Sequence, residues 1–110
     1  MRLLVTGGLG FIGSNFILNT LKNNEKISIT NIDAELLGSD HNNLLELKNS
    51  SNYHFVKGNI TNRNLMEKLI GLKKTKVAVF ISGTGSNLKN LIKFSNKKNS
   101  PISINLIISN

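Results

Sequence analysis

A glycine-rich stretch near the start of the chain constrains the fold more than any other feature. Residues 6–13 read TGGLGFIG, and they follow an apolar strand pattern at residues 3–5 and precede apolar residues at helical spacing. Glycines in a turn between a strand and a helix let backbone N–H groups approach a diphosphate closely. This order of elements predicts a parallel α/β fold that binds half of a dinucleotide.

The glycine spacing fits such a turn in two registers. Gly8, Gly10 and Gly13 give GxGxxG, whereas Gly7, Gly10 and Gly13 give GxxGxxG. One glycine permits the tight turn, a second lets the backbone approach the diphosphate, and a third lets the helix pack closely on the strand. A flexible glycine turn without a ligand is the alternative interpretation.

An acidic residue follows the second apolar segment, residues 27–32. Asp33 lies about 20 residues after Gly13, the offset at which a carboxylate accepts hydrogen bonds from ribose hydroxyls. A carboxylate at this place favours NAD over NADP, because the 2′-phosphate of NADP would meet a like charge. We therefore expect NAD as the cofactor, with a merely solvated Asp33 as the alternative.

Residues 1–70 resemble the opening of the extended short-chain dehydrogenases/reductases, and most closely of the dTDP-glucose 4,6-dehydratases. The resemblance is carried by residues 4–16, LVTGGLGFIGSNF, and by residues 53–60, YHFVKGNI. It implies an NAD-binding Rossmann half-domain of the NAD-dependent epimerase/dehydratase type. The cofactor-binding residues that it implies are Gly7, Gly10, Phe11, Ile12, Gly13, Asp33, Asn59 and Ile60.

One of these residues departs from the family pattern. The family usually has Asp at the position of Asn59, where the side chain contacts the adenine, and the residue at Ile60 lines the adenine pocket. The Asn59 amide oxygen still offers an acceptor to the adenine amino group, but the charge is gone.

The order of the predicted elements defines the fold class. Residues 53–57 form a third strand, and Thr61 caps a helix that ends at Gly71, so the chain reads βαβαβα with right-handed crossovers. Two further strands are predicted at residues 76–82 and 102–109. We expect a Rossmann-like α/β fold with a parallel sheet, strand order 3-2-1-4-5 and helices on both faces.

The last third of the chain resembles a different family. Residues 79–88, VFISGTGSNL, are similar to the start of the phosphoribosylglycinamide formyltransferases of purine biosynthesis. The resemblance implies that a substrate phosphate binds the loop Gly83, Thr84, Gly85, Ser86 and Asn87, and the small residues before a helix favour an anion independently. A generic strand-to-helix turn is the alternative.

This second resemblance predicts a division of the chain into two parts and a junction. Residues 1–70 form the dehydratase-like part, residues 71–75 the junction, and residues 76–110 the formyltransferase-like part. We expect both parts to share one sheet.

The sequence offers no catalytic pair. Tyr53 and Lys57 have the Tyr-x-x-x-Lys spacing of the dehydratase family, but on a strand this spacing corresponds to about 13 Å. The catalytic positions of both families fall beyond the matching residues. We expect NAD binding without turnover. The alternatives are a truncated formyltransferase-like protein that binds a phosphorylated small molecule, and a fused or truncated gene product without function.

The net charge of +8 is concentrated in residues 67–110, which hold eight lysines and one acidic residue. Lys89, Lys93 and Lys97 recur every four residues, as on the solvent face of an amphipathic helix. This pattern favours a solvated helix over a nucleic-acid-binding surface.

The remaining composition limits other partners. The chain has no cysteine and no run of about 18 apolar residues. His41 and His54 lack neighbouring ligands in sequence and are expected to be ordinary surface residues. We expect a cytoplasmic protein without a metal, nucleic-acid or membrane partner, and the sequence leaves the oligomeric state open.

Overall fold

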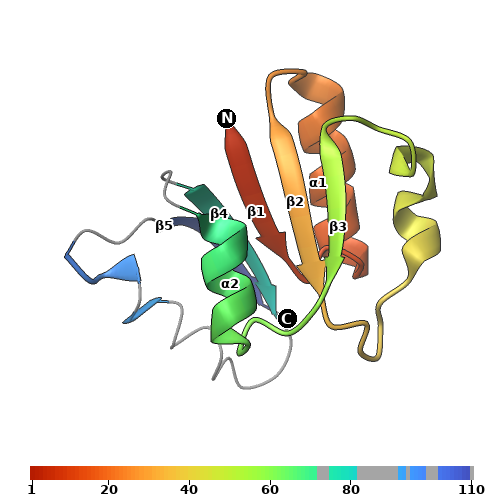
Figure 1. Cartoon of the computed structure of the whole chain (residues 1–110). Helices are drawn as coiled ribbons and strands as arrows, with labels where there is room; N and C mark the ends of the chain where they lie inside the picture. The colour runs from red at the N-terminus through yellow and green to blue at the C-terminus, as the bar shows by residue number, and fades with distance from the viewer. Residues whose placement is uncertain (72–74, 82–91, 94, 99–101, 110) are drawn as a thin grey trace.

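The computed structural model describes residues 1–71, 75–81, 92–93, 95–98 and 102–109. Within them, five parallel strands form one sheet in the order β3-β2-β1-β4-β5 (Figure 1), which confirms the expected strand order. The strands are β1 (Arg2–Thr6), β2 (Ser28–Asp33), β3 (Tyr53–Lys57), β4 (Thr75–Ile81) and β5 (Ile102–Ser109).

The central strand β1 divides the sheet into two halves. Val5 pairs with Asn31 of β2 on one side and with Ala78 of β4 on the other. The chain first adds β2 and β3 on one side of β1 and then crosses to add β4 and β5 on the other. The strand order therefore reverses beside the carboxyl end of β1, which is the place where parallel α/β sheets bind their ligands.

Helices cover both faces of the sheet, as expected (Figure 1). The helix α1 (Phe11–Asn23) and the 3-10 helix η1 (His41–Leu47) lie on one face, and α2 (Arg63–Ile70) lies on the other. Leu4 of β1 packs with Met66 of α2, whereas its neighbours on the strand pack with Ile17 of α1. This alternation follows from the two-residue period of a strand.

The start of α2 differs from the expectation. Asn62, not Thr61, caps the helix, because the Asn62 side chain accepts a hydrogen bond of 3.1 Å from the Leu65 N–H. Thr61 instead donates its N–H and its hydroxyl to Oδ1 of Asn59. The prediction of a Thr61 cap was wrong because this local turn engages the threonine first. The helix ends at Gly71, as predicted, with a positive φ of 63°.

Several expectations fall on residues outside the described part of the chain. They concern the phosphate loop at residues 83–87, the junction at 72–74, and the amphipathic helix around Lys89. Within the described residues, no helix is long and apolar enough to cross a membrane.

Candidate functional site

The glycine loop between β1 and α1 is fastened to β2 through three consecutive backbone N–H groups. The N–H of Gly7 donates to the carbonyl of Ile32 over 3.0 Å. The next two donate to side chains of β2: Gly8 to Oδ1 of Asn31 and Leu9 to Oδ2 of Asp33, each over 3.0 Å. The loop therefore has a fixed position at the carboxyl edge of the sheet.

Three of the four loop glycines are required by contacts within the protein itself. At Gly8, a Cβ atom would lie 2.3 Å from Oδ1 of Asn31. At Gly13, it would lie 2.5 Å from the carbonyl oxygen of Gly7. Gly7 adopts a φ of +71°, and its Cβ would lie 2.5 Å from the carbonyl oxygen of Phe80. These three positions leave no room for a side chain.

Gly10 is different, because a Cβ atom there would find no atom nearer than 3.6 Å. Its φ of −71° is also accessible to any residue. The packing of the described residues therefore does not require glycine at this position. A glycine at a position with room for a side chain, at the start of a helix, leaves the backbone accessible to a ligand.

The start of α1 has no charged side chains. Gly10 caps the helix without a side-chain hydrogen bond, and no acidic residue lies in the first turn. Residues 3–21 contain no charged side chain. Phe11 and Ile12 follow, with exposures of 78% and 46%. The attraction for an anion would come from helix N–H groups and the helix dipole.

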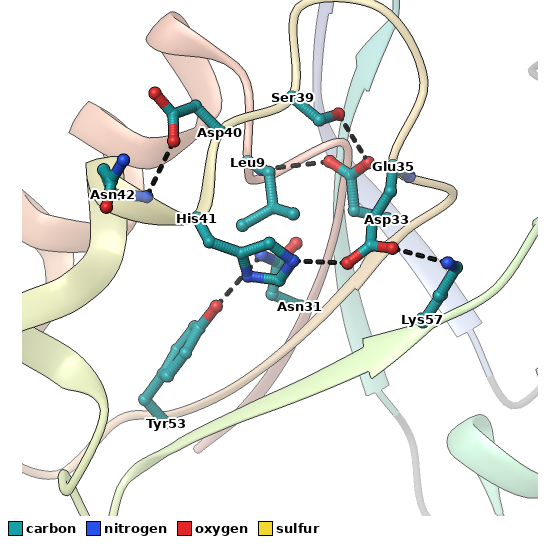
Figure 2. Close-up of polar contacts among 10 residues, drawn as sticks. All are labelled: Leu9, Asn31, Asp33, Glu35, Ser39, Asp40, His41, Asn42, Tyr53 and Lys57. Carbon is teal, nitrogen blue, oxygen red and sulfur yellow. Dashed lines mark hydrogen bonds and ion pairs between the residues drawn. The ribbon is translucent and has the colours of Figure 1, made fainter.

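Asp33 ends β2 next to this loop and accepts three hydrogen bonds (Figure 2). Its Oδ2 accepts from the Leu9 N–H over 3.0 Å. Its Oδ1 accepts from the Glu35 N–H and the Ser39 hydroxyl, each over 2.8 Å. A carboxylate has about four acceptor positions. Asp33 therefore organises the loop and retains capacity on Oδ2 for a ligand hydroxyl.

The carbonyl of Leu9 extends the same connection to the segment that begins η1. It accepts from the Asp40 N–H over 3.1 Å and from the Asn43 side chain over 3.0 Å. Leu9 itself is buried. Its two backbone polar groups thus join the glycine loop, the tip of β2 and η1.

Asn59 and Ile60 follow β3, close to Asp33 along the sheet edge. The Gly58 N–H donates to the Asp33 carbonyl over 3.0 Å. Asn59 is exposed, but its Oδ1 already accepts two hydrogen bonds from Thr61, at 3.0 and 2.9 Å. An adenine amino group would have to displace one of them. Ile60 is half-buried and packs against the core beneath α2.

Sequence reasoning did not identify Asn31 as a residue of this site. Asn31 is fully buried, and its Nδ2 donates to the Tyr53 hydroxyl over 3.1 Å while its Oδ1 holds the Gly8 N–H. Burial raises the pKa of Tyr53. The available signal was the single amide side chain in the strand at residues 28–33.

A second cluster that sequence reasoning missed surrounds Glu35. Its Oε2 lies 2.6 Å from Nζ of Lys57, and its Oε1 contacts Nε2 of His41 (Figure 2). These contacts, led by the hydrogen bond from Lys57, lower the pKa of Glu35. His41 is exposed, as expected, and its ring also meets Phe55 edge-on at 4.8 Å between ring centroids.

The strand order, the glycine loop at the reversal point and the acidic tip of β2 define a Rossmann-like α/β protein. The family described as GDP-mannose 4,6 dehydratase matches residues 4–81, so the chain belongs to this family. From the sequence, the dehydratase resemblance was expected to end at residue 70. The family match continues beyond that point and includes β4.

Individual relatives agree with this assignment. The low-salt glycan biosynthesis protein Agl12 of Haloferax volcanii is 40% identical over 70 residues, which are 64% of this chain and 22% of Agl12. The dTDP-glucose 4,6-dehydratase of Xanthomonas campestris is 39% identical over 67 residues, 61% of this chain and 18% of that enzyme. The chain thus spans about a fifth of the length of these relatives.

Solved structures extend the comparison to most of the chain. A dTDP-glucose 4,6-dehydratase from Bacillus anthracis, crystallised in complex with NAD, has a TM-score of 0.80 and 32% identity. That alignment covers 96% of this chain and 36% of the enzyme. The dehydratase DesIV from Streptomyces venezuelae, with NAD and TYD bound, has a TM-score of 0.67 and 25% identity over 87% of this chain and 30% of DesIV.

Proposed function

We propose that this chain binds NAD at the carboxyl edge of its sheet, as the N-terminal part of a dTDP-glucose 4,6-dehydratase-like protein. The observation that carries the proposal is the open side of Gly10, next to a fixed glycine loop and at the start of a helix whose first turns carry no charged side chain. Two of the similar dehydratases have structures with NAD bound. A dinucleotide also matches the chemistry of a helix N-terminus beside a carboxylate.

Different residues would bind different parts of the dinucleotide. The backbone N–H groups of Phe11, Ile12 and Gly13 would hold the diphosphate, because the Gly10 N–H already donates to the Gly7 carbonyl over 3.3 Å. The exposed side chains of Phe11 and Ile12 would lie beside it. Asp33 would accept a hydrogen bond from the adenosine ribose. The remaining residues, Asn59 and Ile60, would border the adenine.

Turnover is not part of the proposal for this chain. Bound NAD would supply hydride transfer, but Tyr53 and Lys57 have separate partners: Tyr53 bonds to Asn31 and Lys57 pairs with Glu35. A role in nucleotide-sugar conversion would therefore belong to a longer protein that contains this part.

Isothermal titration with NAD tests the proposal. We expect binding by the wild-type chain and a loss of at least about tenfold in affinity in Gly10→Val, whose side chain would occupy the open side of the loop. Asn19→Val is the matched control, because it adds the same side chain on the exposed part of α1. Equal NAD affinities for wild type and Gly10→Val, with both folded by circular dichroism, would contradict the proposal.

The formyltransferase-like interpretation is a second hypothesis that rests on the sequence of residues 79–88. It proposes a phosphate at Gly83, Thr84, Gly85, Ser86 and Asn87. It predicts that inorganic phosphate raises the melting temperature and that Gly85→Val abolishes this effect. A chain that responds to neither NAD nor phosphate would instead favour a product without ligand function.

A further inference from the structure

The charged cluster around Glu35 lies beside the carboxylate that would select the cofactor. The Glu35 N–H donates to Oδ1 of Asp33 over 2.8 Å. Lys57 is the register partner of Asp33 on β3. Figure 2 shows the Glu35 carboxylate between the ends of Lys57 and His41, adjacent to Asp33. The cluster thus belongs to the sheet edge where the adenosine ribose is proposed to bind.

The backbone holds Glu35 at this position. Glu35 has a φ of +57°, a left-handed conformation that few residues other than glycine adopt. Its hydrogen bond to Asp33 closes a short turn, and its side chain is 27% exposed, compared with 69% for Lys57 and 59% for His41. Glu35 is therefore the most enclosed member of the cluster, and the two basic side chains converge on it.

The charges of the cluster bear on the difference between NAD and NADP. The 2′-phosphate of NADP carries close to two negative charges and is bound by basic side chains near the ribose. Lys57 is a basic side chain at this edge, and its ammonium group forms an ion pair with Glu35. Hydrogen bonds from Lys57 first and then from His41 lower the pKa of Glu35, which favours its ionised form.

We propose that Glu35 is a second determinant of cofactor choice, which acts by keeping Lys57 paired and so denies a 2′-phosphate its cation. Asp33 repels the 2′-phosphate directly, whereas Glu35 acts through Lys57 as a positioning residue. The inference rests on the proposed NAD site.

The test compares the affinities of NAD and NADP by isothermal titration. In Glu35→Gln, we expect the ratio of the NADP to the NAD dissociation constant to fall by about two- to fivefold, the scale of one exposed charge pair. The gain should shrink at high salt, because the site is exposed. Glu35→Asp should keep a ratio near that of the wild type.

Two further variants separate a charge effect at this site from other causes. Glu25→Gln makes the same charge change at the exposed turn before β2, at the opposite edge of the sheet, and should leave the ratio unchanged. Adding Lys57→Gln to Glu35→Gln should cancel the gain in NADP affinity. All variants should melt cooperatively.

The outcomes distinguish this inference from the proposed function. NAD binding by the wild type, with the same ratio in Glu35→Gln as in Glu25→Gln, would overturn the inference alone. A gain that persists without Lys57 would also overturn it. Absence of NAD binding by the wild type would overturn the proposed function, and the inference with it.

Discussion

The backbone N–H of Leu9 donates a 3.0 Å hydrogen bond to Oδ2 of Asp33. This bond joins the glycine loop after β1 to the acidic end of β2, so the residue proposed to hold the ribose also shapes the loop proposed to hold the diphosphate. Asp33 therefore has a structural role that can be measured without any ligand.

Replacement of Asp33 by Asn should destabilise the chain. Three donors now bond to the Asp33 carboxylate, and the NH2 group of an asparagine side chain would face one of them as a second donor. The free energy of unfolding should therefore fall by about 1 to 3 kcal/mol. Urea unfolding measures this change. Asp40→Asn is the control, because Asp40 is exposed and the amide oxygen of the new asparagine can still cap η1. Equal losses in both variants would contradict the structural role of Asp33.

Asp33→Ala should also weaken NAD binding. The loss of a charge-assisted hydrogen bond to the ribose corresponds to about 1.5 to 3 kcal/mol of binding free energy. Titration should be done below the melting transition of the variant. An affinity within twofold of the wild type would remove Asp33 from the proposed site.

Alanine should have little effect on stability at Gly10 but should destabilise the fold at Gly13. A methyl group at Gly10 meets no atom nearer than 3.6 Å, so Gly10→Ala should change the free energy of unfolding by no more than about 1 kcal/mol. At Gly13 the methyl would lie 2.5 Å from the Gly7 carbonyl oxygen, and overpacking costs about 1 to 3 kcal/mol or more. Thermal unfolding distinguishes the two. A Gly13→Ala chain as stable as the wild type would contradict the close contact.

Asn31 and Tyr53 should be energetically coupled. Asn31→Ala leaves the Gly8 N–H without its acceptor and the Tyr53 hydroxyl without its donor, so we expect a loss of about 2 to 4 kcal/mol. Tyr53→Phe removes one hydroxyl and should cost about 0.5 to 1.5 kcal/mol. The loss of unfolding free energy in the double variant should be smaller than the sum of the two single losses, by at least about 0.5 kcal/mol. Strict additivity would exclude the coupling.

Tyr53 should also contribute to the alkaline limit of stability. Burial raises its pKa above the unfolded value of 10.0. The contribution is fully present below pH 10, because the phenol is protonated in both states. It is lost as the pH rises through the folded pKa, since the unfolded chain releases the proton first. The melting temperature of the wild type should therefore fall more steeply above about pH 10 than that of Tyr53→Phe; parallel curves would contradict this.

The fold was predictable because its signals are local. Strand, turn and helix patterns of residues 1–71 fix the order of elements, and right-handed crossovers then leave few sheet orders, of which 3-2-1-4-5 is the observed one. The position of Asp33 beside the glycine loop was predictable for the same reason, because the motif has a fixed offset.

The contacts that the sequence did not predict depend on distant residues. Glu35 meets Lys57 because the register of β2 and β3 places Lys57 beside Asp33, and no local pattern encodes that register. In the sequence Asn31 is one polar residue within a strand. Its role becomes evident only from its contact with the loop that follows β1. The Thr61 cap was wrong for a different, local reason: Asn62 and Thr61 were both possible caps, and Thr61 bonds to Asn59 instead.

The three N–H groups of Gly7, Gly8 and Leu9 are all directed at β2, so the loop has little freedom left to lose when a ligand arrives. Conformational entropy of about 1 to 2 kcal/mol per residue is then given up during folding and not during association. A receptor of this kind is preorganised, and the contact energy of the ligand is not reduced by the cost of ordering the loop. A substitution that loosens the anchoring of this loop to β2 should therefore lower both the stability of the sheet edge and the affinity of the site.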